Sequence, residues 1–137
     1  MKNKTMKIIK YSFLLVVFIS CANDKGEAVP AIVNCASDTI SVVSFSKNIV
    51  PIFNTYCNYA GCHSGTTPTG RLNLTASVAY SQLMQKGTGY VNTTNPNYSV
   101  LYSEMNSTSK PMPPTGRLDP CTIKLVYNWI QQQAKNN

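Results

Sequence analysis

The chain has 137 residues and a formal net charge of +7. This length accommodates one domain with appendages and excludes a large multidomain enzyme. Four of the twelve Lys and Arg residues lie in the first ten positions; from residue 21 onward, eight basic residues stand against five acidic ones, a net charge of +3 without a basic run. The charge pattern therefore argues against a dedicated nucleic-acid-binding protein.

Residues 1–20 have the pattern of an export signal. A lysine-rich stretch precedes nine apolar residues, Tyr11 to Ile19. Nine residues span about 14 Å as a helix, far short of the roughly 30 Å hydrocarbon core of a bilayer, which excludes a membrane span. The segment Phe18-Ile19-Ser20-Cys21 resembles the bacterial lipobox. We therefore expect lipidation at Cys21, with ordinary cleavage after Ala22 as the alternative.

The mature chain is predicted to be exported and anchored by lipid to a bacterial membrane, on its periplasmic or cell-surface side. Residues 21–39 are predicted to be the lipid-anchored tether and residues 40–137 the folded domain, because Asn23, Gly26 and Pro30 interrupt any periodicity in the tether. From residue 21 onward, Leu, Ile, Val and Phe supply only 23 of 117 residues. So small a core needs further stabilisation, from disulfides or from a large apolar cofactor.

Four helices are predicted in the folded domain. The first spans about residues 46–57, capped by Ser46, with Pro51 expected to delay or kink its start. The second spans about residues 75–86 and is capped by Thr75, the third begins at Asn95-Pro96, and the last runs from Asp119-Pro120 to about residue 134. Residues 40–45 form either a short strand or an extended arm. The predicted apolar faces are Ile49, Ile52, Phe53 and Tyr56; Val78, Leu83 and Met84; Val100, Leu101 and Met105; and Ile123, Val126, Tyr127 and Ile130, with Trp129 beside them.

The chain contains five cysteines. If Cys21 carries the lipid, four are left, and they allow three disulfide pairings. Cys57 and Cys62 lie together, which leaves Cys35 and Cys121, 86 residues apart. A disulfide between them would contribute about 4–5 kcal/mol by the chain-entropy model. Two buried free thiols are the alternative.

A short segment occurs twice in the chain. Pro68-Thr-Gly-Arg-Leu-Asn73 is repeated as Pro114-Thr-Gly-Arg-Leu-Asp119. The two copies are either two similar turns without further meaning, or sites where Arg71 or Arg117 contacts an anionic group of a cofactor.

The chemistry-bearing residues lie in the segment from Cys57 to His63. His63 is the only histidine, and it directly follows Cys62. Two thiols can add to the vinyl groups of a haem, and the next residue can then bind the iron through its imidazole. The usual spacing is Cys-x-x-Cys-His, whereas four residues separate these cysteines. The extra residues must bulge outward, and Gly61 favours such a bulge.

A second axial ligand has to be a sulfur, since no other histidine exists. Met84 and Met105 lie on predicted helical faces, where methionine usually fills the core. Met112 lies between Pro111 and Pro113, which hold the backbone extended and prevent a helix. Met112 is therefore the preferred distal ligand, with Met105 next. The alternative is a stiff loop with a merely buried methionine.

These features resemble the c-type cytochromes, specifically the small lipoprotein cytochrome c domains of Bacteroidetes, and are similar to those in planctomycete proteins. The resemblance covers about residues 40–134 and rests on the Cys57–His63 segment, Leu72-Asn73-Leu74, the segment from Asn95 to Tyr102, Met112-Pro113-Pro114 and Trp129-Ile130. It implies an all-α fold of about four helices around one covalently bound haem c, with Trp129 and Ile130 packed against the helix that bears Phe53.

The resemblance also implies the roles of individual residues. Cys57 and Cys62 would form the thioethers, and His63 and Met112 would bind the iron. The protein would then be a monohaem electron carrier rather than an enzyme. It would exchange electrons with redox partner proteins and act on no small-molecule substrate.

Two other functions stay open at this point. The first is a haem enzyme or gas sensor with an open sixth position, although no second histidine and no acid–base pair supports it. The second is a haem-free binding lipoprotein in which Cys57 and Cys62 form another disulfide. Zinc binding is disfavoured, because Cys57, Cys62 and His63 supply only three ligands.

Overall fold

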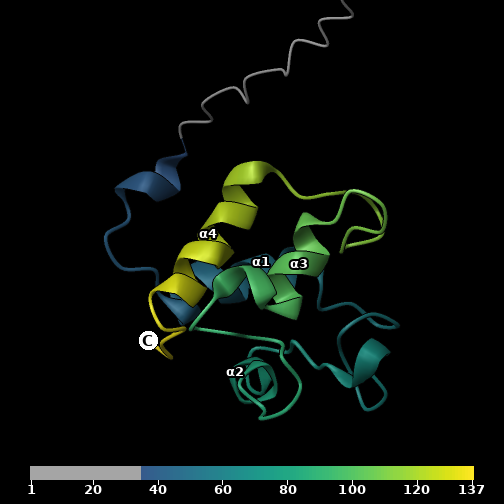
Figure 1. Cartoon of the computed structure of the whole chain (residues 1–137). Coiled ribbons are helices and arrows are strands. Elements are labelled where there is room, and N and C mark those ends of the chain that lie inside the picture. The colour runs from purple at the N-terminus through teal and green to yellow at the C-terminus, as the bar shows by residue number, and fades with distance from the viewer. Residues whose placement is uncertain (1–34) are drawn as a thin grey trace, which may run out of the picture. The chain divides into compact units, whose positions relative to one another are not determined.

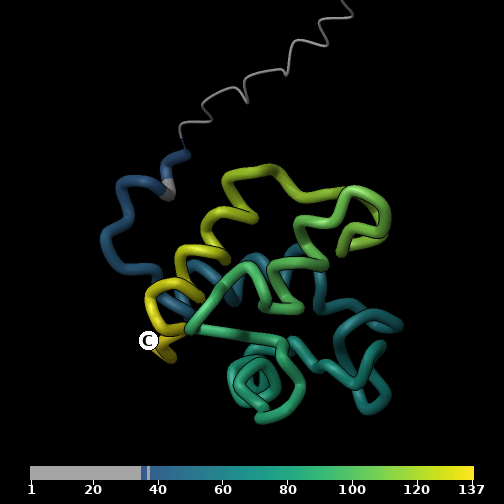
Figure 2. The backbone as a smooth tube through the Cα atoms, viewed as in Figure 1, coloured from purple at the N-terminus to yellow at the C-terminus, as the bar shows by residue number. Residues whose placement is uncertain are grey.

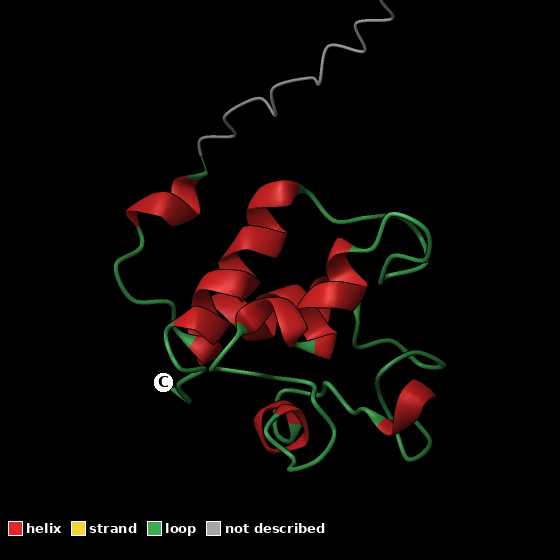
Figure 3. Cartoon of the chain, viewed as in Figure 1, coloured by secondary structure: helices red, strands yellow, loops and turns green. Residues whose placement is uncertain are grey.

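The structure is a computed structural model that describes residues 35–137. The predicted export signal, Cys21 and most of the predicted tether lie outside the described residues. In the described part, all regular secondary structure is helical and no strand forms (Figure 3). This part of the chain is therefore all-α, as expected. None of its helices has the length and hydropathy needed to cross a membrane.

The first helix begins as a π-helical turn, η2 (Phe45–Ile49), and continues as α1 (Val50–Tyr56). Its cap is Ser44 rather than the predicted Ser46: the Ser44 hydroxyl oxygen accepts from the Lys47 N–H, and the Asn48 side chain accepts from the Ser44 N–H. The change from π to α hydrogen bonding falls beside Pro51, which has no N–H to donate. No strand precedes this helix within the described residues, so residues 40–44 form the extended arm.

The middle of the domain is less helical than predicted. Helix α2 (Ala79–Leu83) is much shorter than the expected residues 75–86, and Thr75 contributes its backbone carbonyl to the preceding turn instead of a side-chain cap. The Asn95-Pro96 signal starts a 3-10 turn, η4 (Pro96–Tyr98), and helix α3 (Val100–Asn106) follows it. Another 3-10 turn, η3, spans Thr69–Arg71.

Helix α4 (Pro120–Gln131) begins where the sequence predicts and ends early. The Asp119 carboxylate accepts from the Thr122 N–H at 2.9 Å, so the predicted cap is confirmed. Positive φ angles at Gln133 and Ala134 turn the chain back after the helix. The Ala134 N–H then donates to the Trp129 carbonyl at 2.9 Å. This reversal explains why the helix does not reach residue 134.

One hydrophobic core joins the two ends of the domain. The Phe45 ring lies 5.2 Å from the Trp129 ring and 6.4 Å from the Phe53 ring, measured between centroids. Both Trp129 and Phe53 are fully buried. Near the C-terminus, Asn137 accepts from the N–H groups of Phe45 and Ser46, which brings the last residues beside the start of η2 (Figure 1). The expected packing of the last helix against the first is therefore present.

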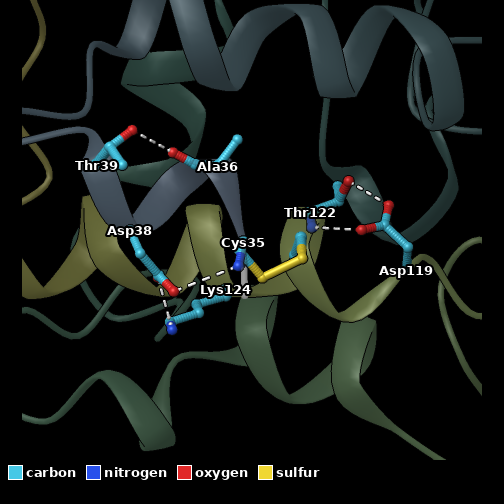
Figure 4. Close-up of a disulfide and its surroundings, with 8 residues drawn as sticks. Cys35, Ala36, Asp38, Thr39, Asp119, Thr122 and Lys124 are labelled. Carbon is cyan, nitrogen blue, oxygen red and sulfur yellow. Dashed lines mark hydrogen bonds and ion pairs between the residues drawn. A yellow bond between two sulfur atoms is a disulfide. The ribbon is translucent and has the colours of Figure 1, made fainter. Parts of the chain in front are cut away.

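A disulfide attaches the segment before the core to α4. Cys35 and Cys121 are bonded, with their Cα atoms 5.3 Å apart, as the sequence predicts. Directly after Cys35, the 3-10 turn η1 (Ala36–Thr39) carries Asp38, whose carboxylate lies 2.6 Å from the Lys124 ammonium (Figure 4). The folded unit thus includes residues 35–39, which the sequence analysis had assigned to the tether.

Candidate functional site

A mostly apolar cavity of about 280 Å³ lies at the end of α1. Its volume is close to the lower end of the roughly 300–1,000 Å³ typical of ligand and cofactor pockets. The four residues predicted to attach and ligate a haem all line it: Cys57, Cys62, His63 and Met112. They come from two loops, one after α1 and one after α3, which lie on the same side of the domain, away from the C-terminus (Figure 2).

The loop between the two cysteines is a compact turn held by its own backbone. The Cys62 N–H donates to the Tyr59 carbonyl at 2.9 Å, and the His63 N–H donates to the Cys57 carbonyl at 3.1 Å. Gly61 has a φ of 82°, which a residue with a side chain rarely adopts. Tyr59 and Ala60 are exposed, while both cysteines are half-buried. The longer spacing is therefore absorbed by an outward bulge, and both thiols still line the cavity.

The His63 imidazole is oriented by the neighbouring loop. Its Nδ1 lies 3.1 Å from the Leu72 carbonyl oxygen. Because a carbonyl oxygen only accepts, Nδ1 carries a proton, and in the neutral ring Nε2 then keeps its lone pair. The backbone is fixed as well, since the Leu74 N–H donates to the His63 carbonyl at 2.7 Å. This arrangement suits a metal-ligating histidine, whose other ring nitrogen usually donates to a carbonyl or carboxylate.

Met112 reaches the cavity from the loop after α3. Its N–H donates to the Glu104 carbonyl at 2.9 Å, which ties the loop to the end of that helix. Pro113, which follows Met112 through a cis peptide bond, also lines the cavity. Met105 lines it too, from α3, and is almost completely buried. Both candidate thioether ligands therefore face the same space.

Cys57 and Cys62 are free thiols in the structure. Burial, with a smaller contribution from the neighbouring Cys62, raises the pKa of Cys57 to about 11. At neutral pH the Cys57 thiol is therefore protonated, and its nucleophilicity is low.

Several residues that line the cavity were not predicted from the sequence. Glu104 supplies the one ionisable carboxyl group of the lining and, together with Leu101 and Met105, forms an i, i+3, i+4 set on α3. That spacing could have placed Glu104 on the cavity face. Tyr90 also lines the cavity, and its hydroxyl donates to the Gly70 carbonyl at 3.1 Å. No local signal in the sequence points to Tyr90.

The two arginines of the repeated segment do not line this cavity. Arg71 faces a separate polar groove on the loop after His63. Its backbone φ angle is 58°. Arg117 lines a cavity between α3 and α4 and donates to the Asn106 side-chain oxygen. The structure therefore does not bring Arg71 and Arg117 together with the cysteines, His63 and Met112.

Comparisons of the chain with protein families, with curated proteins and with solved structures find no match. Within residues 35–137, no three side chains of His, Cys, Asp or Glu cluster in the way that a metal site of those ligands requires. The geometry of the cavity is therefore the basis for any functional proposal.

Proposed function

We propose that the protein is a monohaem c-type cytochrome with a cytochrome c-like fold, an exported and lipid-anchored electron carrier. Cys57 and Cys62 attach the haem, while His63 and Met112 bind its iron. The observation that carries the proposal is the shared cavity, because residues from two separate loops line it with the donor set of such a site. Lipid attachment at Cys21 and export are proposed from the sequence alone.

The chemistry of the cavity fits the cofactor. Two thiols are available for thioether bonds, and both are unpaired in the structure. In the neutral imidazole of His63, the Nε2 lone pair is free for iron because Nδ1 donates to the Leu72 carbonyl. The rest of the lining is mostly aliphatic and aromatic, including Leu72, Leu74 and Leu101, and such walls favour a large planar apolar group. Burying this group adds the apolar contacts that the composition lacks.

His63 and Met112 would have different roles in binding the haem. The Leu72 carbonyl holds the His63 ring in one tautomer. Met112 presents a thioether from a loop that is hydrogen-bonded to the Glu104 carbonyl. A haem bound in this way supplies an iron that cycles between the ferrous and ferric states. Thioether ligation stabilises the ferrous state and raises the reduction potential. With a net charge of only +3 from residue 21 onward, electrostatic steering toward redox partner proteins is expected to be modest.

An alkaline pyridine spectrum of protein made in a host with c-type maturation tests the proposal. A ferrous α-band at the position of thioether-linked haem, and a mass increased by one haem, are expected. A control cytochrome with the usual Cys-x-x-Cys-His spacing must acquire haem in the same host. If the control acquires haem and this protein does not, the electron-carrier proposal is wrong, and a haem-free binding lipoprotein becomes the leading alternative.

Replacing Met112 by Ala separates an electron carrier from a haem enzyme or sensor. For a carrier, we expect the potential to fall by a substantial part of the roughly 0.8 V that axial ligation can span. Met105→Ala is the matched control, since Met105 lines the same cavity from a helix. An unchanged potential in both Met112→Ala and Met105→Ala would indicate an open sixth position. A lower reduction potential in Met105→Ala alone would show that Met105, and not Met112, is the second iron ligand.

A further inference from the structure

A second cavity, of about 330 Å³, lies between α3 and α4. It shares no lining residue with the cavity of the cysteines and is therefore a separate candidate site. Its polar lining consists of Asn97, Tyr102, Asn106, Arg117, Lys124 and Tyr127. No carboxylate of residues 35–137 belongs to the lining.

Hydrogen bonds within the lining leave it rich in donors. Arg117 donates one of its five N–H groups to the Asn106 side-chain oxygen. The Asn106 side-chain nitrogen donates in turn to the Tyr102 hydroxyl oxygen at 3.4 Å. The Asn106 oxygen and the Tyr102 oxygen thus each already accept one hydrogen bond. The Tyr102 O–H and the other N–H groups of Arg117 can still donate, so the complementary ligand group is an acceptor.

The charges around the cavity favour a ligand whose acceptor group is negatively charged. Lys124 is paired with Asp38 at 2.6 Å, in the one ion pair found within the described residues. Asp119 lies close to Arg117 in sequence, but its carboxylate accepts from the Thr122 N–H and hydroxyl. Arg117 therefore carries a positive charge that no carboxylate of residues 35–137 neutralises by an ion pair. A planar guanidinium pairs best with a carboxylate or another oxyanion.

Aromatic rings give the cavity an apolar surface beside this charge. The rings of Tyr102 and Tyr127 are 5.0 Å apart and tilted by 59°. We propose that the cavity binds a small organic carboxylate, whose oxygens accept from Arg117 and the Tyr102 hydroxyl while its apolar body lies against the ring of Tyr127. Recognition of both parts distinguishes this ligand from a simple inorganic anion.

Calorimetric titration of the exported protein with benzoate, acetate and inorganic phosphate tests the proposal. We expect saturable binding of benzoate, at least about tenfold tighter than binding of acetate or phosphate, because only benzoate has a planar apolar body. Arg117→Gln should weaken benzoate binding by about tenfold or more, as for loss of a charge-assisted hydrogen bond. Arg71→Gln is the matched control, since Arg71 occupies the same place in the other copy of the repeated segment, and it should bind benzoate unchanged.

Three results would overturn the proposal: no saturable heat with benzoate, equal benzoate affinity in wild type and Arg117→Gln, or phosphate binding as tight as benzoate binding. The last of these would indicate a general oxyanion site. The NMR signal of the Asn106 side-chain amide is a second readout that needs no variant. It should shift with benzoate because Asn106 lies between Arg117 and Tyr102. A signal that does not move at saturating benzoate would place binding elsewhere.

Discussion

The two cysteine pairs of the described domain differ in spacing, in oxidation state and in surroundings. Cys35 and Cys121 are 86 residues apart in sequence, yet they form the disulfide. Cys57 and Cys62 are separated by only four residues, yet both are free and line the apolar cavity. Closeness in sequence therefore does not decide which thiols pair. The packing of η1 against α4 joins the distant pair, while the turn at Tyr59 holds the near pair at the cavity wall.

Removing Cys57 and Cys62 should have the largest effect, because it removes both thiols that would attach the haem. In the double variant Cys57→Ala/Cys62→Ala, we expect complete loss of covalently bound haem, because no other free thiol of residues 35–137 lines the cavity. Haem staining after denaturing electrophoresis measures this loss. The double variant Cys35→Ser/Cys121→Ser is the matched control and should keep its covalent haem. Equal haem content in the two variants would show that the two pairs do not differ in function.

Removing the distant pair should lower stability. We expect Cys35→Ser/Cys121→Ser to reduce the free energy of unfolding by about 4 kcal/mol, since the disulfide closes a long loop. Urea unfolding followed by circular dichroism gives the value. The single variant Asp38→Ala controls for the ion pair beside the disulfide, and it should lower stability far less than loss of the disulfide because the pair is exposed to solvent. A disulfide variant as stable as wild type would mean that the bond contributes little.

The half-buried thiol of Cys57 is expected to react slowly. Because burial raises the pKa of Cys57 to about 11, little thiolate exists below that pH. In haem-free protein we expect Cys57 to react with iodoacetamide about 100-fold more slowly than a thiol with an ordinary pKa, with the rate rising until the pH approaches 11. Mass spectrometry of Cys62→Ala at a series of pH values gives the rates for Cys57 alone. A rate that levels off near pH 9 would show that Cys57 is not buried in solution.

Removing the Asp119 side chain, which caps α4 beside Cys121, should have the smallest effect of these predictions on stability. We expect Asp119→Ala to lower the free energy of unfolding by about 1 kcal/mol, as for other helix caps. Hydrogen bonds from Thr122 hold the pKa of Asp119 below its ordinary value. The stabilisation is therefore present above the ordinary carboxyl pKa and is lost as the pH falls through the lowered pKa.

Urea unfolding of Asp119→Ala and wild type at several pH values measures this contribution. The difference in stability between the two proteins should shrink as the solution is acidified. Thr122→Val removes only the hydroxyl partner and should cost less than Asp119→Ala, since the Thr122 N–H still donates to the carboxylate. A difference that stays constant down to low pH would show that the Asp119 charge does not stabilise α4.

Local signals in the sequence predicted some elements well and others poorly. The start of α4 was correct because Asp119 and Pro120 act on the backbone directly beside them. The cap of the first helix was placed at Ser46 instead of Ser44, because the choice depends on Asn48 reaching back to the Ser44 N–H. Val78 and Met84 were expected on an apolar face, yet both are exposed, and they only flank α2, which spans Ala79–Leu83. Short helices depend on tertiary contacts, which a local pattern does not contain.

The repeated segment illustrates the same limit. Both copies bury their leucine, Leu72 and Leu118, as expected from identical apolar residues. Their backbones nevertheless differ: Arg71 has a positive φ in a 3-10 turn, whereas Arg117 does not and precedes the cap of α4. The arginines consequently face different cavities, and neither faces the cysteines. The same local sequence thus lies in two different environments, because different elements follow the two copies.

The helical class of the described domain, the pairing of Cys35 with Cys121 and four residues that line the first cavity from two loops could be predicted from the sequence. The helices and the cavity residues follow from spacing, from proline and glycine positions and from the kinds of side chain, which act locally, whereas the disulfide was predicted only by setting Cys57 and Cys62 aside. The tertiary structure alone shows that Glu104 and Tyr90 join this cavity and that Arg117 and Tyr127 line a second cavity. Each of these depends on how separate helices pack, because a cavity exists only between elements that are distant in the chain.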